Sequence, residues 1–171
     1  QLITGYPTNH VSTDMQNQAY KVRNNLMKNG AKKIICILDE NSLDDERWHT
    51  GHNLQEENYK YVLLELLKNK NLGLIFKPKH YVTLKERIGD TYLLLEEAIN
   101  TGRCFIYDEL NSNKFKTTKA TPLLAALSSD LVVHSHLCAG TAAVETALAN
   151  IPTVLIDRES DNQSIFYKIM D

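Results

Sequence analysis

The stretch LVVHSHLCAGTAAVETALANIPTVLID, residues 131–157, decides the fold of this chain. It reads as an apolar strand, Leu131–His134, then a turn ending at Gly140, an alanine-rich helix ending at Asn150, and a second buried strand, Thr153–Ile156. Both strands are short, apolar and rich in β-branched residues, as expected of strands buried on both faces of a parallel sheet. This stretch therefore predicts one strand–helix–strand unit of an α/β fold.

The start of the alanine-rich helix is the first candidate binding site. A helix that begins beyond the carboxyl end of a parallel strand directs free backbone N–H groups and a positive dipole end toward that edge. We therefore expect Gly140 and Thr141 to seat an anion, most commonly a phosphate. Glu145 follows about one and a half turns later, and its apolar neighbours predict a mostly buried helix with this single charge. An alanine-rich helix packed on a sheet without any ligand is the alternative.

The rest of the chain alternates apolar runs with helical segments. Further strands are expected at Ile34–Leu38, Leu74–Phe76 and Cys104–Tyr107. Helices are expected from Ser12 or Thr13 to about Asn29, from Leu54 to Lys70, from Thr91 to Asn100, from Thr121 to Leu127 and from about Gln163. The alternation predicts a single α/β domain over residues 1–171, with a Rossmann-like, doubly wound parallel sheet and helices on both faces. In such sheets ligands bind outside the carboxyl ends of the strands.

Composition excludes several classes of function. The net charge of −2 disfavours nucleic-acid binding, which usually requires a basic excess. The chain has no apolar run long enough for a transmembrane segment and no signal-peptide pattern. Cys36, Cys104 and Cys138 show no pair spacing, so we expect buried free thiols in a reducing compartment.

The 131–157 stretch resembles the nucleotide-sugar half of glycosyltransferases with the GT-B fold. A Gly-Thr-Ala turn at 140–142, a helix carrying Glu145 and a proline-containing strand at 151–154 follow one another as in lipid A disaccharide synthase and its relatives. The resemblance implies binding of a nucleotide-linked donor for surface polysaccharide or lipopolysaccharide synthesis, without a metal or other cofactor. Under that reading Gly140, Thr141 and Glu145 bind the donor, with Glu145 accepting hydrogen bonds from ribose hydroxyls.

The segment Lys77-Pro78-Lys79-His80 directly follows an apolar strand and supplies further candidates. It resembles the Lys-Pro-His-Pro turn of CDP-glycerol glycerophosphotransferases and capsule polysaccharide enzymes, but Lys79 stands where those enzymes have their phosphate-facing His. The resemblance implies that His80 is a catalytic residue that hydrogen-bonds the donor diphosphate. Lys77 or Lys79 would neutralise the charge of that diphosphate. A solvated turn with ordinary surface lysines is the alternative.

The segment His134-Ser135-His136 lies just before the predicted anion seat. We expect His136 to act as the second catalytic residue, by hydrogen bonding to phosphate or donor sugar, and Ser135 to bind the donor. His134 is expected to be a buried histidine with satisfied hydrogen bonds. A metal site that includes Cys138 is disfavoured, because structural zinc sites usually draw on two ligand clusters. The preceding Ser-Ser-Asp, residues 128–130, is expected to form a helix terminus and turn.

Two expectations concern what lies beyond this chain. It starts without Met, and residues 3–7 look like the passage joining the halves of a GT-B enzyme, so we expect a missing amino-terminal acceptor-binding domain. The isolated chain should then be inactive; if it is active alone, His52 or Asp39 is the first candidate for the base.

The expected location is cytoplasmic, with membrane association through the full-length protein as an alternative. A UDP-sugar 2-epimerase and a non-catalytic nucleotide-binding domain are the rival functions.

Overall fold

Five short apolar segments pair side by side into one sheet in the computed structural model, which describes residues 11–40, 42, 51–107, 121–135 and 140–156. The strands are β1 (Lys33–Leu38), β2 (Leu72–Lys77), β3 (Cys104–Ile106), β4 (Leu131–His134) and β5 (Thr153–Leu155). Their spatial order is β3-β2-β1-β4-β5, and every neighbouring pair is parallel. The predicted Rossmann-like α/β fold with a doubly wound parallel sheet is confirmed.

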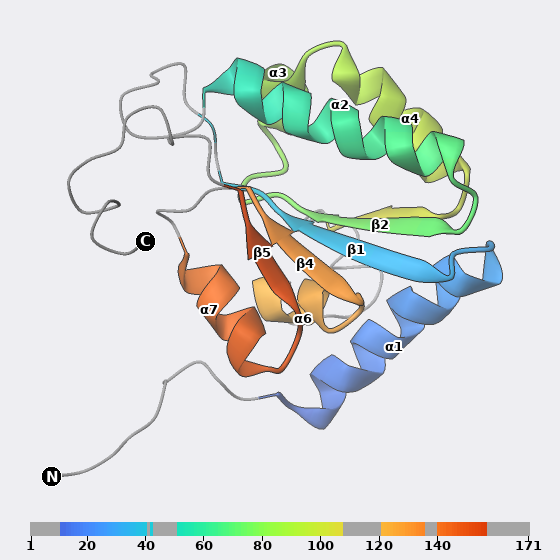
Figure 1. The fold of residues 1–171 in the computed structure, drawn as a ribbon, viewed down its shortest axis with the longest axis vertical. Helices are drawn as coiled ribbons and strands as arrows, with labels where there is room; N and C mark the ends of the chain where they lie inside the picture. Colours follow the sequence, from blue (N-terminus) through green and yellow to red (C-terminus); the bar gives the residue numbers. More distant parts are fainter. Residues whose placement is uncertain (1–10, 41, 43–50, 108–120, 136–139, 157–171) are drawn as a thin grey trace, which may run out of the picture.

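Helices cover both faces of the sheet (Figure 1). One face carries α2 (His52–Lys68), α3 (Leu84–Ile88) and α4 (Thr91–Asn100). The other carries α1 (Thr13–Lys28), α6 (Pro122–Ala126) and α7 (Thr141–Leu148). The strand β1 shows why its sequence is apolar at nearly every position: Ile34 and Cys36 pack in the layer of α1 and α6, whereas Ile37 packs in the layer of α2 and α4.

Local signals set the helix ends. The hydroxyl of Ser12 accepts a hydrogen bond from the N–H of Met15 at 3.2 Å and caps α1, as expected. The helices α1 and α4 end close to Gly30 and Gly102, whose φ angles of 106° and 72° lie in the left-handed region that favours glycine. These ends confirm the predicted helices within one or two residues. The short helix α3 was not predicted.

Asp130 joins three elements at the amino edge of the sheet. Its Oδ1 accepts a hydrogen bond from Nη2 of Arg23 on α1 at 2.7 Å, and its Oδ2 accepts one from the N–H of Ile34 on β1 at 2.8 Å. Burial alone would raise the pKa of Asp130, but these hydrogen bonds and the charge of Arg23 outweigh it and lower the pKa. Ser128 and Ser129 donate their backbone N–H groups to carbonyls at the end of α6, as the predicted helix terminus requires, whereas the contacts of Asp130 were not predicted.

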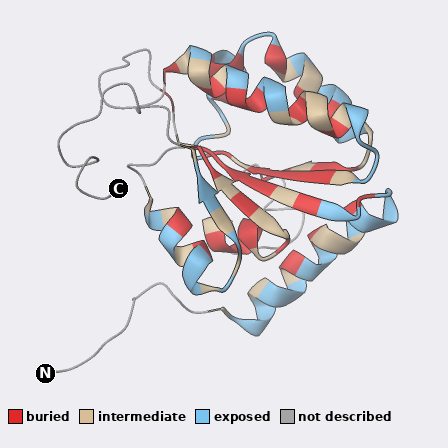
Figure 2. Ribbon diagram, viewed as in Figure 1, coloured by how far each residue is buried: buried red, intermediate tan, exposed pale blue. Residues whose placement is uncertain are grey.

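Two expectations about burial are wrong. The strand β5 is an edge strand, and Val154 is 50% exposed, because only β4 pairs with β5 among the described residues (Figure 2). The helix α7 buries only Ala143 and Thr146 and leaves Val144 48% exposed, so it is not mostly buried. Apolar composition alone does not reveal whether a neighbouring element covers a strand or helix.

Cys36 and Cys104 are buried free thiols, as predicted, and burial raises the pKa of both well above the ordinary value. Cys138 and the helix expected from about Gln163 lie outside the described residues. Among the residues that the structure describes, no helix combines the length and apolar character needed to cross a membrane.

Candidate functional site

The sheet reverses its strand order next to β1, and this is where a ligand site is expected. The strands β2 and β3 are added on one side of β1, and β4 and β5 on the other. Leu38 at the end of β1 is in register with Lys77 on β2 and with His134 on β4. The residues that follow these three positions therefore leave the sheet side by side. In open α/β sheets, ligands bind in the crevice at such a switch point, outside the carboxyl ends of the strands.

A pocket of about 400 Å³ lies at this switch point. It is lined by Glu40, Lys79, Pro122, Thr141, Ala142 and Glu145. Glu40 follows β1 and Lys79 follows β2, whereas the other four residues belong to α6 and α7. A larger pocket, of about 450 Å³, lies beside α1 and β3. The predicted anion seat at the start of α7 therefore borders the smaller of these two pockets.

The amino end of α7 borders the pocket. Gly140 is the N-cap residue, and the N–H of Val144 donates to the carbonyl of Gly140 at 2.8 Å as the first bond of the helix. The N–H groups of residues 141–143 therefore have no carbonyl partner within the helix. Thr141 and Ala142 line the pocket, so the positive end of the helix dipole lies at its wall. Glu145 lines the same pocket one turn further along.

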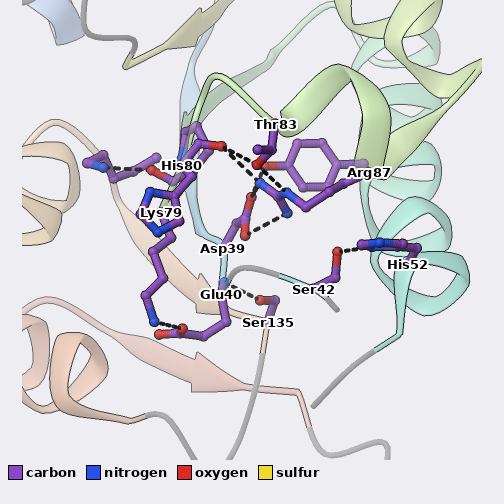
Figure 3. A network of polar contacts seen from close by, with 12 residues as sticks. Asp39, Glu40, Ser42, His52, Lys79, His80, Thr83, Arg87 and Ser135 are labelled. Carbon is purple, nitrogen blue, oxygen red and sulfur yellow. Dashed lines mark hydrogen bonds and ion pairs between the residues drawn. The ribbon is translucent and has the colours of Figure 1, made fainter. Parts of the chain in front are cut away.

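An ion pair between Lys79 and Glu40, from the loops after β2 and β1, forms another part of the pocket wall. The Nζ of Lys79 lies 2.6 Å from Oε2 of Glu40, and the two side chains are 53% and 19% exposed (Figure 3). The other carboxylate oxygen, Oε1, lies 4.0 Å from Nε2 of His134, which is buried as expected. Charged groups of both signs thus meet here: the carboxylates of Glu40 and Glu145, and the ammonium of Lys79.

Ser135 holds the end of β1 in place. Its hydroxyl accepts a hydrogen bond from the backbone N–H of Glu40 at 3.2 Å, and its own N–H donates to the carbonyl of Leu38 at 3.0 Å. Ser135 is buried and is not among the residues that line the pocket. Ser135 therefore holds the backbone of Glu40 in place. It is not among the residues that would contact a donor in the pocket.

A buried polar cluster lies next to the pocket. Arg87 on α3 donates from Nη2 to Oδ2 of Asp39 at 3.2 Å and from Nη1 to Oδ1 at 3.4 Å, and the hydroxyl of Tyr59 donates to Oδ2 at 2.8 Å. Burial raises the pKa of Asp39, and Arg87 and Tyr59 oppose that rise. Asp39 is fully engaged in these contacts, so it is poorly suited to be the base of a reaction.

Arg87 also holds the turn after β2. Its Nη2 donates to the carbonyl of His80 at 3.2 Å, and its Nε donates to the hydroxyl of Thr83 at 3.2 Å (Figure 3). Asp39 precedes Glu40 and His80 follows Lys79, so one guanidinium contacts the neighbour of each member of the ion pair, through the carboxylate of Asp39 and the carbonyl of His80. Sequence reasoning missed Arg87, since a buried arginine cannot be told from an exposed one by residue type.

The remaining predicted site residues lie as follows. The Nζ of Lys77 donates to the carbonyl of Pro78 at 2.7 Å, and Lys77 does not line the pocket. His80 is exposed on the turn and does not line it either. His136 lies outside the described residues, so its expected convergence with His80 stays a prediction. His52 begins α2, and its Nδ1 lies 2.7 Å from the hydroxyl of Ser42.

The structure adds Glu40, Pro122 and Ala142 to the site, and it favours Lys79 over Lys77. For Glu40 and Lys79 the sequence showed only that each follows a strand end, and the register that brings them together comes from the structure. Glu40 and Lys79 each stand two positions beyond strand ends that pair in register, so their side chains leave the sheet on the same side. No group of three or more histidine, cysteine or acidic side chains is placed to hold a metal ion within the described ranges.

Comparisons with models of protein families, with curated proteins and with solved structures found no match to this chain. The residues that line the pocket are therefore the evidence for the chemistry of the site. It combines a helix start, a lysine and two carboxylates, which suit a ligand carrying both phosphate and hydroxyl groups.

Proposed function

We propose that this chain is the donor-binding domain of a GT-B-type glycosyltransferase, which transfers a sugar or polyol phosphate from a nucleotide-linked donor during surface polysaccharide or lipopolysaccharide synthesis. One observation carries the proposal: the pocket at the switch point between β1 and β4 is bordered by the amino end of α7 and by Glu145. This is the position at which Rossmann-like sheets take nucleotide ligands.

The pocket suits the two halves of a nucleotide-linked donor. The N–H groups at Thr141 and Ala142 and the positive dipole end favour the phosphates, and Lys79 offers a further positive charge. Glu145 provides an acceptor for ribose or sugar hydroxyls. During transfer, negative charge grows on the departing nucleotide phosphate, and groups already aimed at that charge lower the barrier.

Transfer also requires an acceptor held against the donor in reactive geometry. We propose that a further domain provides the acceptor site and the catalytic base. Two observations support this: Asp39 is bound by Arg87 and Tyr59, and Nδ1 of His52 is paired with Ser42. Neither candidate base lines the pocket at the switch point.

A ligand panel tests the nucleotide part of the proposal. Thermal unfolding of the chain is followed with UDP, CDP, CMP, GDP and their sugar derivatives, and with the matching nucleosides as controls. A ligand that binds the folded state alone raises the midpoint by mass action. We expect one base to shift the midpoint as the diphosphate and not as the nucleoside. A panel without any shift would contradict the proposal.

A second experiment tests the reaction class. The 171-residue chain and a longer protein that contains it together with an acceptor-binding domain are incubated with the nucleotide sugar identified by the panel. We expect transfer to an acceptor by the longer protein and none by the chain alone. Release of free epimerised sugar would instead identify an epimerase.

A further inference from the structure

Among the described residues that line the pocket, Lys79 carries the only positive charge, and its ammonium is paired with the carboxylate of Glu40. The 2.6 Å contact joins its Nζ to Oε2 of Glu40 (Figure 3). A phosphate seated on the amino end of α7 would enter the same pocket and would meet both side chains. The question is therefore which partner Lys79 keeps once an anion is bound.

The balance of interactions favours the anion. Lys79 is 53% exposed, and an exposed lysine–carboxylate pair contributes little net stability because water and salt screen it. A diphosphate carries more negative charge than one carboxylate, and it also receives the backbone N–H groups at Thr141 and Ala142. The flexible four-carbon stem of lysine allows its ammonium to rotate between two acceptors.

The backbone around the pair is held firmly, so the exchange requires only side-chain rotation. Asp39, next to Glu40, is bound by the buried Arg87, which also binds the carbonyl of His80, next to Lys79. Ser135 fixes the N–H of Glu40 itself. Because the backbone N–H of Glu40 is bound by Ser135, Glu40 stays at the pocket wall after its side chain loses Lys79.

We propose that Lys79 exchanges partners on ligand binding, from Glu40 to a phosphate of a diphosphate ligand, and that Glu40 limits the affinity for that diphosphate. The inference rests on the proposed function and names the ligand chemistry that Lys79 reads. Glu40 thus competes with the ligand for Lys79 and lowers the affinity for an anion by the modest amount that an exposed ion pair contributes.

The test is calorimetric titration with inorganic diphosphate and, separately, with UDP, CDP and GDP. Glu40→Gln should raise the affinity for inorganic diphosphate about two- to fivefold, the range that an exposed ion pair allows. Lys79→Met should lower it by at least as much, whereas Lys70→Met, which removes an exposed lysine from the opposite edge of the sheet, should not change it. Circular dichroism confirms that each variant is folded.

Two further variants separate exchange from a general charge effect. Glu96→Gln removes the same charge from the exposed surface of α4, away from the residues that line the pocket, and should leave the affinity for inorganic diphosphate within about twofold of the wild type, below the gain from Glu40→Gln. In the Lys79→Met background, Glu40→Gln should raise the affinity for inorganic diphosphate much less than it does in the wild type. The reason is that no ammonium remains to be released from Glu40. The proposal would be overturned if the control variant, or Glu40→Gln in the Lys79→Met background, raised the affinity for diphosphate as much as Glu40→Gln does in the wild type. It would also be overturned if Glu40→Gln did not raise that affinity.

The same titrations distinguish a failure of the proposed function from a failure of the Lys79 exchange. If inorganic diphosphate binds with the predicted pattern and no nucleotide binds, the exchange stands and the donor-binding function fails. If nucleotides bind and Glu40→Gln does not raise their affinity or that of diphosphate, the function stands and the exchange is overturned. A wild-type protein that binds neither ligand overturns both.

Discussion

Arg87 and Asp39 form an ion pair at the carboxyl edge of the sheet, with Nη2 of Arg87 3.2 Å from Oδ2 of Asp39 and the side chains 3% and 0% exposed. The pair connects α3 to the end of β1, and the same guanidinium binds the carbonyl of His80 after β2. Two loops that carry the pocket residues Glu40 and Lys79 are thereby held together. This buried pair is the structural basis of the candidate site.

Replacing Arg87 by Met should destabilise the protein strongly. The change leaves the carboxylate of Asp39 buried with only Tyr59 as a donor among the described contacts, and breaking a buried pair from one side typically costs about 3–5 kcal/mol. Urea denaturation measures the free energy of unfolding. The double variant Asp39→Asn/Arg87→Met should recover part of the loss, because no uncompensated charge remains. A loss below about 1 kcal/mol for Arg87→Met would contradict this account.

The stability should fall in acid partly through Asp130. Its pKa is lower in the folded protein than in the unfolded chain, since hydrogen bonds from Arg23 and Ile34 outweigh burial. A lowered carboxyl pKa contributes stability above the unfolded value of about 3.9 and loses it as the pH falls toward the folded value. Asp130→Asn should therefore be less stable than the wild type at pH 7, with the difference shrinking below about pH 4. Denaturant titrations across this range measure it, and a difference independent of pH would refute the assignment.

Gly73→Ala should destabilise the sheet. A Cβ at this position would lie 2.8 Å from Cβ of Ala31 and 3.1 Å from Cγ1 of Ile34, and both neighbours belong to the buried core. Overpacking of this kind typically costs about 1–3 kcal/mol. The compensating double variant Ala31→Gly/Gly73→Ala should be more stable than Gly73→Ala alone, as judged from urea midpoints. If Ala31→Gly did not raise the urea midpoint of Gly73→Ala, the contact with Ala31 would not be the source of the strain.

Glu145→Gln should weaken nucleotide binding selectively. If the carboxylate accepts hydrogen bonds from ribose hydroxyls, loss of its charge should lower the affinity for the nucleoside diphosphate about tenfold, because hydrogen bonds to charged groups are worth about 1.5–3 kcal/mol. Calorimetry provides the affinity. Glu96→Gln, which removes an exposed carboxylate from α4, is the matched control and should bind as the wild type does. Equal effects of the two variants would remove Glu145 from the site.

The strand and helix positions were predictable because they depend on local patterns. The continuous apolar run at β1 and the serine before α1 each act within a few residues. The helix α3 was missed because it has only five residues, Leu84–Ile88, and depends on packing against α2. Thr141 and Glu145, the residues of the predicted anion seat and its neighbouring carboxylate, both line the pocket, and anion binding there stays a prediction.

The sequence by itself determined the alternation of strands and helices and the helix start after β4, since periodicity and capping are read within one segment. Only the tertiary structure decided that β4 lies beside β1, that β5 is an exposed edge, and that Lys79 meets Glu40 across 39 positions of sequence. Those contacts depend on register between distant strands and on which faces other elements cover. Residue type carries no information on either, because the same lysine or glutamate is compatible with solvent, an ion pair or a ligand.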